Sequence, residues 1–390
     1  MPRSFRRTFT ARKIGLAIDV VGAYGRGVVR GVMAYAKPRN WVITVEPRWS
    51  FEDAPDVKQW DVEGVITQVY SRDFQRRVLA RGVTATNVSN FIADKVRLPT
   101  VIPDDRAVGL LAADYFRGRG FRQFGFCGPL DHGFSVLRLE GFRAGVDRIG
   151  GELHVCDPRA QEMVKWARSL PHPVAVLGCN DQWAHQLLND CRRAGIDVPA
   201  QLAILGVDND DLINALVAPS LSSIDLPTER IGFEAARLLD RLLDGRNAPP
   251  ADPIVFPPGG VVTRQSTDVS AISDPDVVAA SKFIREHADQ PIRVEDVLDG
   301  VPLGRRTLER RFRQAMGRSI LSEIRRAHVE RAKQLLGATQ LSNPAIAEAC
   351  GFSNSSRFGI TFRQLTGVTP GEFRRNLHAR PERREGDAGP

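Results

Sequence analysis

The chain has 390 residues, 42% of them hydrophobic and 26% charged, a balance that favours a folded globular protein over a disordered or fibrous one. This length exceeds one ordinary hydrophobic core, so two or three domains are expected. No stretch of the sequence reaches the roughly 20 apolar residues that span a bilayer, which argues against a membrane protein.

From the N-terminus, a basic tail over 1–13 leads into a region where short apolar runs alternate with longer amphipathic stretches. Such alternation is typical of parallel strands joined by crossover helices. The predicted strands are 14–20, 41–46, 64–67, 100–103, 123–127, 174–178 and 203–207. The predicted helices include 25–37, 105–119, 137–149, 182–194 and 229–243. Two sheets fit the length better than one, so we expect a two-lobed α/β region over 14–267.

The composition changes near residue 270. Pro-rich stretches over 249–258 and 270–275 mark the exit from the α/β region, so we expect a linker over 268–280, an all-α domain over 281–380 and a polar tail over 381–390. From Val301 to Arg380 the chain carries 15 Lys and Arg against 5 Asp and Glu, a local charge of +10 in a chain of net charge +8. Basicity confined to one segment indicates phosphate neutralisation, although solvated helix faces give the same count.

The all-α domain contains two copies of a helix-turn-helix pattern, which predicts DNA binding. In the second copy Pro344 suits a first helical turn, Ile346 and Ala349 lie at core spacing, Gly351 permits a left-handed turn, and Ser353 can cap the next helix. In the first copy, a helix over 294–298 and a turn over 300–302 precede a helix over 305–314. A long amphipathic helix over 320–336 joins the copies, so that two readers on one connector can meet successive major-groove faces.

Residues near the start of each second helix are the predicted DNA contacts. Arg306, Glu309 and Arg310 share one face by helical spacing, whereas Arg305 is better placed for phosphate. The second reader offers Asn354, Ser355, Ser356 and Arg357 at its start, where recognition helices meet base edges. Helix capping and ordinary surface polarity are the alternative interpretation of each residue.

Four blocks of this domain, 311–319, 331–336, 346–352 and 367–375, resemble the AraC family of transcription regulators in order and spacing. The resemblance implies base reading at Ser355 and Ser356. Two positions depart from the family pattern, because Gly304 stands where a Ser cap is usual and Pro302 where the first turn often has Gly. We therefore expect the first reader helix to lack a good cap.

The α/β region also resembles a known family. The strings 138–142, 177–181, 204–209 and 262–266 are similar to the LacI and periplasmic-binding-protein sensors, whose two α/β lobes close on a small sugar. The order of the two parts, with further strings at 23–24, 28–32 and 221–223, resembles regulators of bacterial xylose operons. The resemblance implies control of transcription by xylose or a related sugar bound between two lobes.

Polar residues that follow predicted strands form the predicted sugar site. Asp181 and Asp208 can accept bonds from hydroxyls at the strand ends, and Arg138 can donate to ring and hydroxyl oxygens. The further candidates are Asn180, Asn209, Asp19, Tyr24 and Arg26, with Trp49, and less so Trp183, as a stacking surface. Each has a plainer interpretation: the Asn and Asp residues can cap helices or order loops, Arg138 can lie on a helix surface, and Trp183 can belong to a core.

Other classes of protein fit less well. The string 22–27 has neither dinucleotide nor phosphate-loop spacing, and the sequence lacks His-Glu-x-x-His and Gly-x-Ser-x-Gly motifs, so an enzyme is the weaker alternative. The five cysteines are odd in number and show no Cys-x-x-Cys spacing, which indicates reduced thiols. With no secretory signal, we expect a cytoplasmic protein rather than a secreted transport receptor. The expected partners are operator DNA, a sugar effector, a second copy of the chain and RNA polymerase, with no cofactor, metal or membrane.

Overall fold

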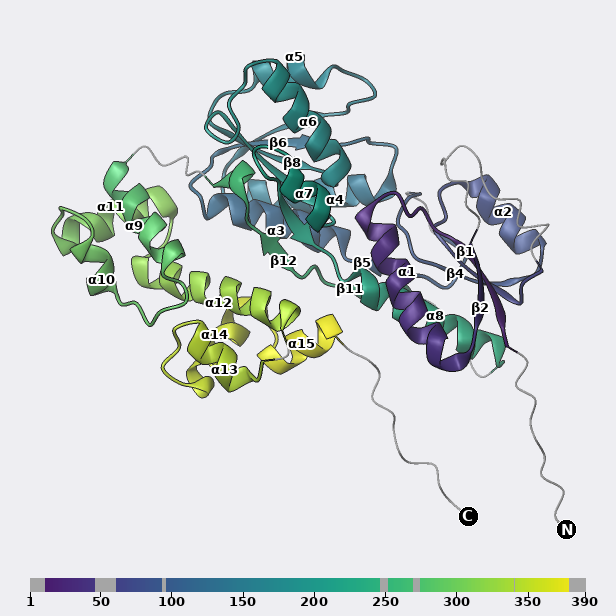
Figure 1. Cartoon of the computed structure of the whole chain (residues 1–390). Helices are drawn as coiled ribbons and strands as arrows, with labels where there is room; N and C mark the ends of the chain where they lie inside the picture. The colour runs from purple at the N-terminus through teal and green to yellow at the C-terminus, as the bar shows by residue number, and fades with distance from the viewer. Residues whose placement is uncertain are drawn as a thin grey trace, which may run out of the picture. The chain divides into compact units, whose positions relative to one another are not determined.

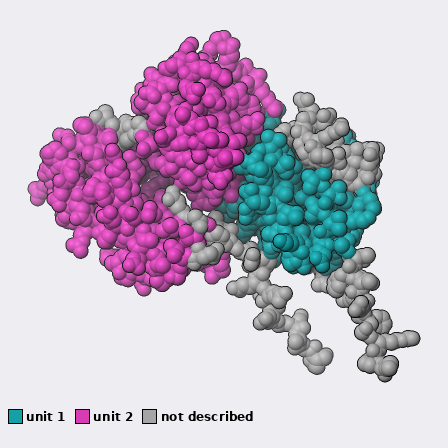
Figure 2. Space-filling model, in the orientation of Figure 1, with its two compact units in different colours: residues 1–104, 130–136, 227–257 teal, residues 105–129, 137–226, 258–390 magenta. Residues whose placement is uncertain are grey.

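The computed structural model describes residues 11–45, 61–92, 96–245, 252–268, 274–339 and 341–378 (Figure 1). Two compact units account for the chain, the first made of 1–104, 130–136 and 227–257, the second of 105–129, 137–226 and 258–390 (Figure 2).

The first unit is built on a parallel sheet in the order β2-β1-β3-β4. Its strands are β1 (Lys13–Ala17), β2 (Val42–Val45), β3 (Gly64–Thr67) and β4 (Thr84–Asn87), and β5 (Val101–Pro103) pairs in parallel with β11 (Ile254–Phe256). Its helices are α1 (Ala23–Ala36), α2 (Arg72–Ala80) and α8 (Thr228–Leu243), with a short 3-10 turn at Lys37–Arg39. Helices α1 and α8 approach closely because Gly31 has no side chain: a Cβ there would lie 1.8 Å from the Glu229 carbonyl oxygen.

The second unit contains a six-stranded sheet in the order β12-β10-β9-β8-β6-β7. The strands are β6 (Gln123–Cys127), β7 (Glu152–Cys156), β8 (Val174–Gly178), β9 (Leu202–Val207), β10 (Ser222–Asp225) and β12 (Gly260–Val262). All of these pairs are parallel except β10 with β12. Helices α3 (Asp105–Arg117), α4 (Gly133–Asp147), α5 (Met163–Ser169), α6 (Asp181–Arg193) and α7 (Asp211–Leu216) connect the strands.

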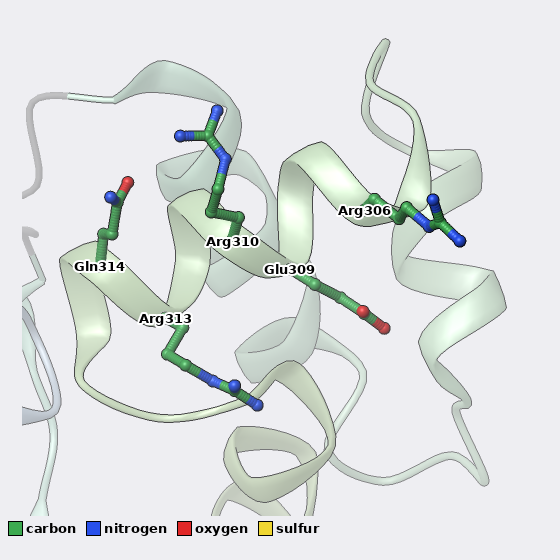
Figure 3. A pocket seen from close by; sticks show the side chains of 5 residues that line it. All are labelled: Arg306, Glu309, Arg310, Arg313 and Gln314. Carbon is green, nitrogen blue, oxygen red and sulfur yellow. The ribbon is translucent and has the colours of Figure 1, made fainter.

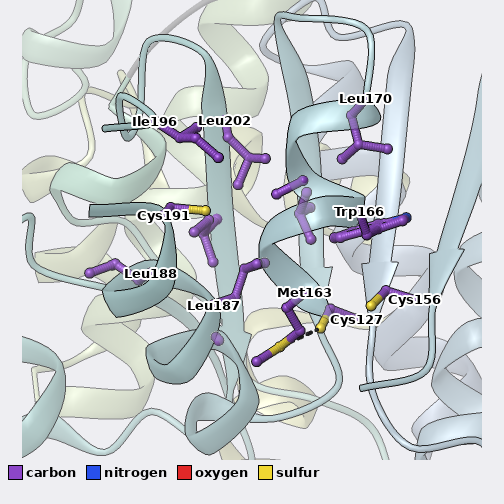
Figure 4. Packing of buried hydrophobic residues seen from close by; sticks show 14 of the residues in the cluster. Cys127, Cys156, Met163, Trp166, Leu170, Leu187, Leu188, Cys191, Ile196 and Leu202 are labelled. Atoms are coloured by element: carbon purple, nitrogen blue, oxygen red, sulfur yellow. Dashed lines mark hydrogen bonds between the residues drawn. The ribbon is translucent and has the colours of Figure 1, made fainter. Parts of the chain in front are cut away.

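The central strands β8 and β9 are buried along their whole length, as expected for parallel strands covered on both faces. Figure 4 shows the apolar cluster in this lobe, in which Trp166, Leu187 and Leu202 pack beside cysteines. The Cys127 thiol donates to the Met163 sulfur at 3.5 Å. All five cysteines are free and buried in the structure.

Helices α9 to α15 form the C-terminal part of the second unit. They are α9 (Pro275–Glu286), α10 (Val294–Asp299), α11 (Arg305–Met316), α12 (Ile320–Ala338), α13 (Asn343–Ala349), α14 (Ser355–Thr366) and α15 (Pro370–His378). Ile324 of α12 belongs to one apolar core and Val329 to a second, so a single helix joins two small cores. This confirms the predicted connector between two readers.

The structure differs from the predicted elements at several places. Strand β1 ends at Ala17, not Val20, because the Asp19 carboxylate accepts a bond from the Val21 amide and turns the chain. Strands β4, β7, β10, β11 and β12 were not predicted, and Thr-Ala-Thr-Asn in β4 and Ser-Ser-Ile-Asp in β10 are not apolar runs. The Pro-rich stretch 249–258 does not mark the exit from the α/β region, because it contains β11, which pairs with β5. Helix α9 begins at Pro275, so part of the stretch predicted as a linker is helical and contributes Ala280 to a core.

Candidate functional site

Arg138 on α4 is the centre of a buried polar group in the second unit. It is 3% exposed, and its Nε donates to Asp105 Oδ1 at 2.8 Å while Nη1 donates to the Cys179 carbonyl oxygen. Its Nη2 lies 4.0 Å from Asp208 Oδ1. Burial opposes the charge of Arg138, yet the carboxylates of Asp105 and Asp208 raise its pKa above the usual value. We call Arg138, Asp105 and Asp208 the effector group, after the role that we propose for it under the proposed function.

Asp208 follows β9 and has an unusual backbone, with φ of 107°. Its side chain is 15% exposed, in contrast to the Asp105 side chain at 1%. Burial raises the pKa of Asp208 to about 8; Arg138 opposes this rise, and the nearby carboxylates of Asp181, Asp105 and Asp210 add to it. The Asp208 carboxyl therefore exchanges its proton near pH 8: it can donate a hydrogen bond below this pH and only accepts above it.

Asp181 is engaged within the fold. Its Oδ1 accepts from Ser223 Oγ at 2.6 Å, and its Oδ2 accepts from the Asp210 amide and from Asn214 Nδ2, both at 2.8 Å. Burial raises its pKa to about 6, although these three bonds work against the rise. The adjacent Asn180 caps α6 by accepting from the Trp183 amide at 3.1 Å. These contacts favour the structural interpretation that the sequence left open for both residues.

Asn209, with φ of 51°, is held on both sides. Its Nδ2 donates to Asp225 Oδ1 at 3.2 Å, and its Oδ1 accepts from Arg264 Nη2 at 2.9 Å. Sequence reasoning assigned no role to Asp105, Asp225 or Arg264. Asp105 could have been found by the rule used for Asp181 and Asp208, since it too lies shortly after a predicted strand and, like Asp181, begins a helix.

The other predicted ligand residues lie in the first unit or in a core. The Tyr24 hydroxyl donates to the Val88 carbonyl at 2.6 Å, and Arg26 Nη1 donates to the Val21 carbonyl, so both order the loop that includes Asp19. Trp183 packs against the apolar cluster of the second unit. Trp49 lies outside the described residues. The first unit also contains a half-buried aromatic pair that was not predicted from the sequence: the Phe91 and Phe134 ring centroids lie 6.0 Å apart.

The first reader presents charged side chains on α11. Arg306, Arg310, Arg313 and Gln314 are exposed, and with Glu309 they line a shallow surface hollow (Figure 3). Figure 3 shows all five side chains extending away from the helix. Arg305 instead pairs with Glu295 at 2.7 Å and Glu309 at 3.1 Å. Gly304 precedes the helix without a side-chain cap, as predicted.

The second reader begins differently from the prediction. Asn354, not Ser353, caps α14, because its Oδ1 accepts from the Arg357 amide at 2.8 Å. Asn354, Ser355, Ser356 and Arg357 are all exposed, while Phe358 and Phe362 on the opposite side of the helix are buried. Gly351 has the predicted left-handed backbone, with φ of 68°. The exposed end of α14 is therefore available to DNA.

The described residues contain no cluster of three or more His, Cys, Asp or Glu suited to a metal ion. None of their helices combines the length and apolar character needed to cross a membrane.

Comparisons with known proteins agree with this architecture. Residues 113–267 match a periplasmic binding protein-like domain, and residues 299–376 match a helix-turn-helix domain. The chain is 30% identical to the xylose operon regulatory protein of Haemophilus influenzae, covering 93% of this chain and 98% of that protein. The xylose operon regulatory protein of Escherichia coli K12 is 31% identical, over 94% and 98% of the two chains.

Solved structures show the same relationship. The structure of the xylose-binding transcription activator xylR has 29% identity and a TM-score of 0.59, covering 94% of this chain and 98% of that chain. The regulator CelR in complex with cellobiose matches at 23% identity and a TM-score of 0.57 over 66% of this chain and 85% of its own, which shows the fold alone. With sensor and paired helix-turn-helix parts both matched in order, the chain belongs to the family of xylose operon regulatory proteins, DNA-binding transcription regulators with a sugar-sensing domain.

Proposed function

We propose that this regulator responds to xylose or a closely related pentose, and that the effector group binds the sugar. The observation that carries the proposal is the buried Arg138 between two carboxylates at the strand ends, in a chain whose relatives are named for the xylose operon. For Asp181 and Asn180 we propose a structural role instead: because their side chains bond within the protein, they support the loop rather than bind the sugar.

The chemistry of the effector group suits a neutral polyol. Arg138 donates hydrogen bonds, and Asp208 accepts them when ionised and can also donate one when protonated. Vicinal sugar hydroxyls, which both donate and accept, therefore suit both residues. An anionic ligand is disfavoured, because the Asp105 carboxylate already pairs with the single guanidinium and Asp208 adds a second negative charge when it ionises. A neutral sugar adds no net charge to this buried site.

We propose that sugar binding changes operator affinity and that the regulator acts as a homodimer in the cytoplasm. Each chain carries two readers, so a dimer places four helices on DNA and gains from bivalency. A ligand alters DNA affinity only if it favours one arrangement of the chain over another. RNA polymerase is the remaining expected partner. In vitro transcription with and without sugar tests this contact.

Calorimetry across pentoses and hexoses tests the effector. Measured above pH 8, where Asp208 is ionised, Asp208→Asn should weaken sugar binding by about 1.5 to 3 kcal/mol, since a charged hydrogen-bond partner is lost. Arg138→Ala should weaken it as well, but it also leaves Asp105 buried without its guanidinium and so lowers stability. The matched control is Arg193→Gln, which removes an arginine from an exposed surface pair with Asp190 in the same lobe. Unchanged sugar affinity in Asp208→Asn would place the site elsewhere.

DNA reading is tested by a pair of neighbouring arginines. Arg306→Ala should cost about 1 to 3 kcal/mol on the operator and much less on random DNA, because a base contact carries sequence discrimination. Arg305→Ala should weaken binding to both DNAs alike, as expected for a phosphate contact. Fluorescence anisotropy on operator and scrambled duplexes gives both comparisons. Equal losses for Arg306→Ala on the two duplexes would reassign Arg306 to phosphate.

A further inference from the structure

The segment that leaves the sugar-sensing lobe is held by an unusual number of side-chain bonds. After β12, residues 263–268 contain a short 3-10 turn at Gln265–Thr267, and α9 of the DNA-binding part begins at Pro275. We call residues 263–268 the exit segment. The exit segment is the last described part of the sugar-sensing lobe before α9 begins.

Arg264 ties the exit segment to the loop of the effector group. Its Nη1 donates to the Leu221 carbonyl oxygen at 2.8 Å and its Nη2 donates to Asn209 Oδ1 at 2.9 Å. Its backbone is fixed too, since its amide donates to Ser222 Oγ at 2.7 Å. A planar guanidinium that makes two bonds transmits a change of position better than a single flexible contact.

Asn209 can pass a displacement of Asp208 on to Arg264, because its own position is fixed. It follows Asp208 directly, its left-handed backbone fixes the turn between Asp208 and Asp210, and Asp225 holds the far side of its amide at 3.2 Å. A sugar that displaces Asp208 therefore either displaces Asn209 Oδ1, which accepts the bond from Arg264, or breaks that bond.

The far end of the exit segment is bonded to α3, the helix that starts with Asp105 of the effector group, and to the turn that follows this helix. The Tyr115 hydroxyl of α3 lies 2.6 Å from Thr267 Oγ1, and Nε of Arg119, which follows α3, donates to the Thr267 carbonyl at 3.1 Å. The Arg119 guanidinium also lies over the Tyr115 ring, 3.7 Å from its centroid. Both ends of the segment are thus bonded to elements that carry residues of the effector group.

A cavity of about 810 Å³ in the second unit lies beside this segment. Arg264, Arg119 and Tyr115 line it together with Lys282 of α9 and Arg326 of α12. Arg326 Nη2 donates to the Asp114 carbonyl of α3 at 3.1 Å. The residues that grip the exit segment therefore face helices of the DNA-binding part.

We propose that Arg264 is the positioning residue that couples sugar binding to DNA binding, acting through Asn209 on one side and the exit segment on the other. This inference rests on the proposed function, because it requires an operator affinity that responds to sugar. Arg264 itself is not a sugar ligand in this scheme; its guanidinium is used by Leu221 and Asn209.

The test compares full-length wild type, Arg264→Gln, Arg264→Lys and Asn209→Gly, with Arg193→Gln as the control. Glycine is chosen at 209 because it removes the side chain while tolerating the positive φ. Sugar affinity is measured by calorimetry with D-xylose, or with the pentose that binds best. Operator affinity is measured by anisotropy without sugar and at a saturating concentration determined for each variant.

Coupled sites commonly change affinity by on the order of 5- to 150-fold. In Arg264→Gln the sugar-dependent change in operator affinity should shrink to less than about twofold, while sugar still binds and sugar-free operator affinity stays near wild type. Asn209→Gly should lose the response too, and the double variant should lose no more than either single one. Arg264→Lys should respond weakly, because one ammonium cannot hold both acceptors in the same geometry.

The outcomes separate this inference from the proposed function. A wild type that binds sugar but shows no change in operator affinity overturns both. A responsive wild type together with an equally responsive Arg264→Gln overturns only the role of Arg264, as does a variant that loses its response because sugar no longer binds. If Arg264→Gln does not fold, Asn209→Gly tests the same bond and leaves the bond to Leu221 in place.

Discussion

Asp208 and Asp181 are both aspartates that follow a strand of the same sheet, yet their surroundings differ. Asp181 accepts three internal bonds, whereas Asp208 faces Arg138 across 4.0 Å and keeps part of its surface exposed. The difference predicts opposite consequences for the same chemical change at the two positions.

At Asp208 the prediction concerns pH. Its pKa is raised to about 8, mainly by burial, so between about pH 4 and pH 8 the folded chain retains a proton that the unfolded chain has lost. Stability should therefore fall as pH rises through this window. Asp208→Asn removes that titration, so urea unfolding at pH 5 and pH 8 without sugar should show a smaller loss in the variant than in wild type. An identical loss in both proteins would contradict the raised pKa.

At Asp181 the prediction concerns hydrogen bonding. In Asp181→Asn the amide oxygen can keep the bonds from the Asp210 amide and Asn214 Nδ2, but the amide nitrogen then faces Ser223 Oγ. Ser223 already accepts from the Asn209 amide, and its hydroxyl hydrogen loses the acceptor that Asp181 provided. The free energy of unfolding should fall by about 1 to 3 kcal/mol, the usual cost of an unsatisfied buried group. Asp208→Asn at pH 8 is the matched comparison and should show no such loss. Equal stability of the two variants would remove the distinction between support and ligand.

At the scale of the element, two glycines at the second reader have different reasons to be glycine. Gly359 lies inside α14, and a Cβ there would meet no atom within 4 Å. Gly351 has φ of 68°, and a Cβ there would lie 2.1 Å from the Gln290 carbonyl oxygen. Gly359→Ala should therefore stabilise the DNA-binding part by about 1 kcal/mol, while Gly351→Ala should destabilise it. Thermal unfolding of both variants checks the signs, and a loss of stability in Gly359→Ala would show a constraint on α14 beyond helix propensity.

At the scale of the whole molecule, the helices α9 to α15 have their own two apolar cores. A fragment from Ser270 to the C-terminus should fold, bind operator DNA more weakly than the full chain, and show no response to sugar, because it keeps the readers but loses bivalency and the sensor. Operator titrations of both proteins with and without sugar measure this. A fragment that binds as tightly as the full chain would mean that the sensing region adds nothing to DNA affinity.

The sequence by itself determined the class of each part, because the signals involved are local. The apolar strands at Gln123–Cys127 and Val174–Gly178, the turn at Gly351, the uncapped start at Gly304 and the long connector all follow from propensity, periodicity and backbone freedom. The charge concentrated after Val301 and the family motifs led to the same regulator class.

Only the tertiary structure decided how the polar residues are used. Strand β10 was missed because its serines are buried by bonds to residues far away in the chain: Ser223 to Asp181, and Ser222 to Arg264. For the same reason, two aspartates that both follow a strand differ in use: Asp181 supports the fold, whereas Asp208 belongs to the effector group. Which donors surround a carboxylate depends on contacts between distant segments, and a reading of neighbouring residues does not contain that information.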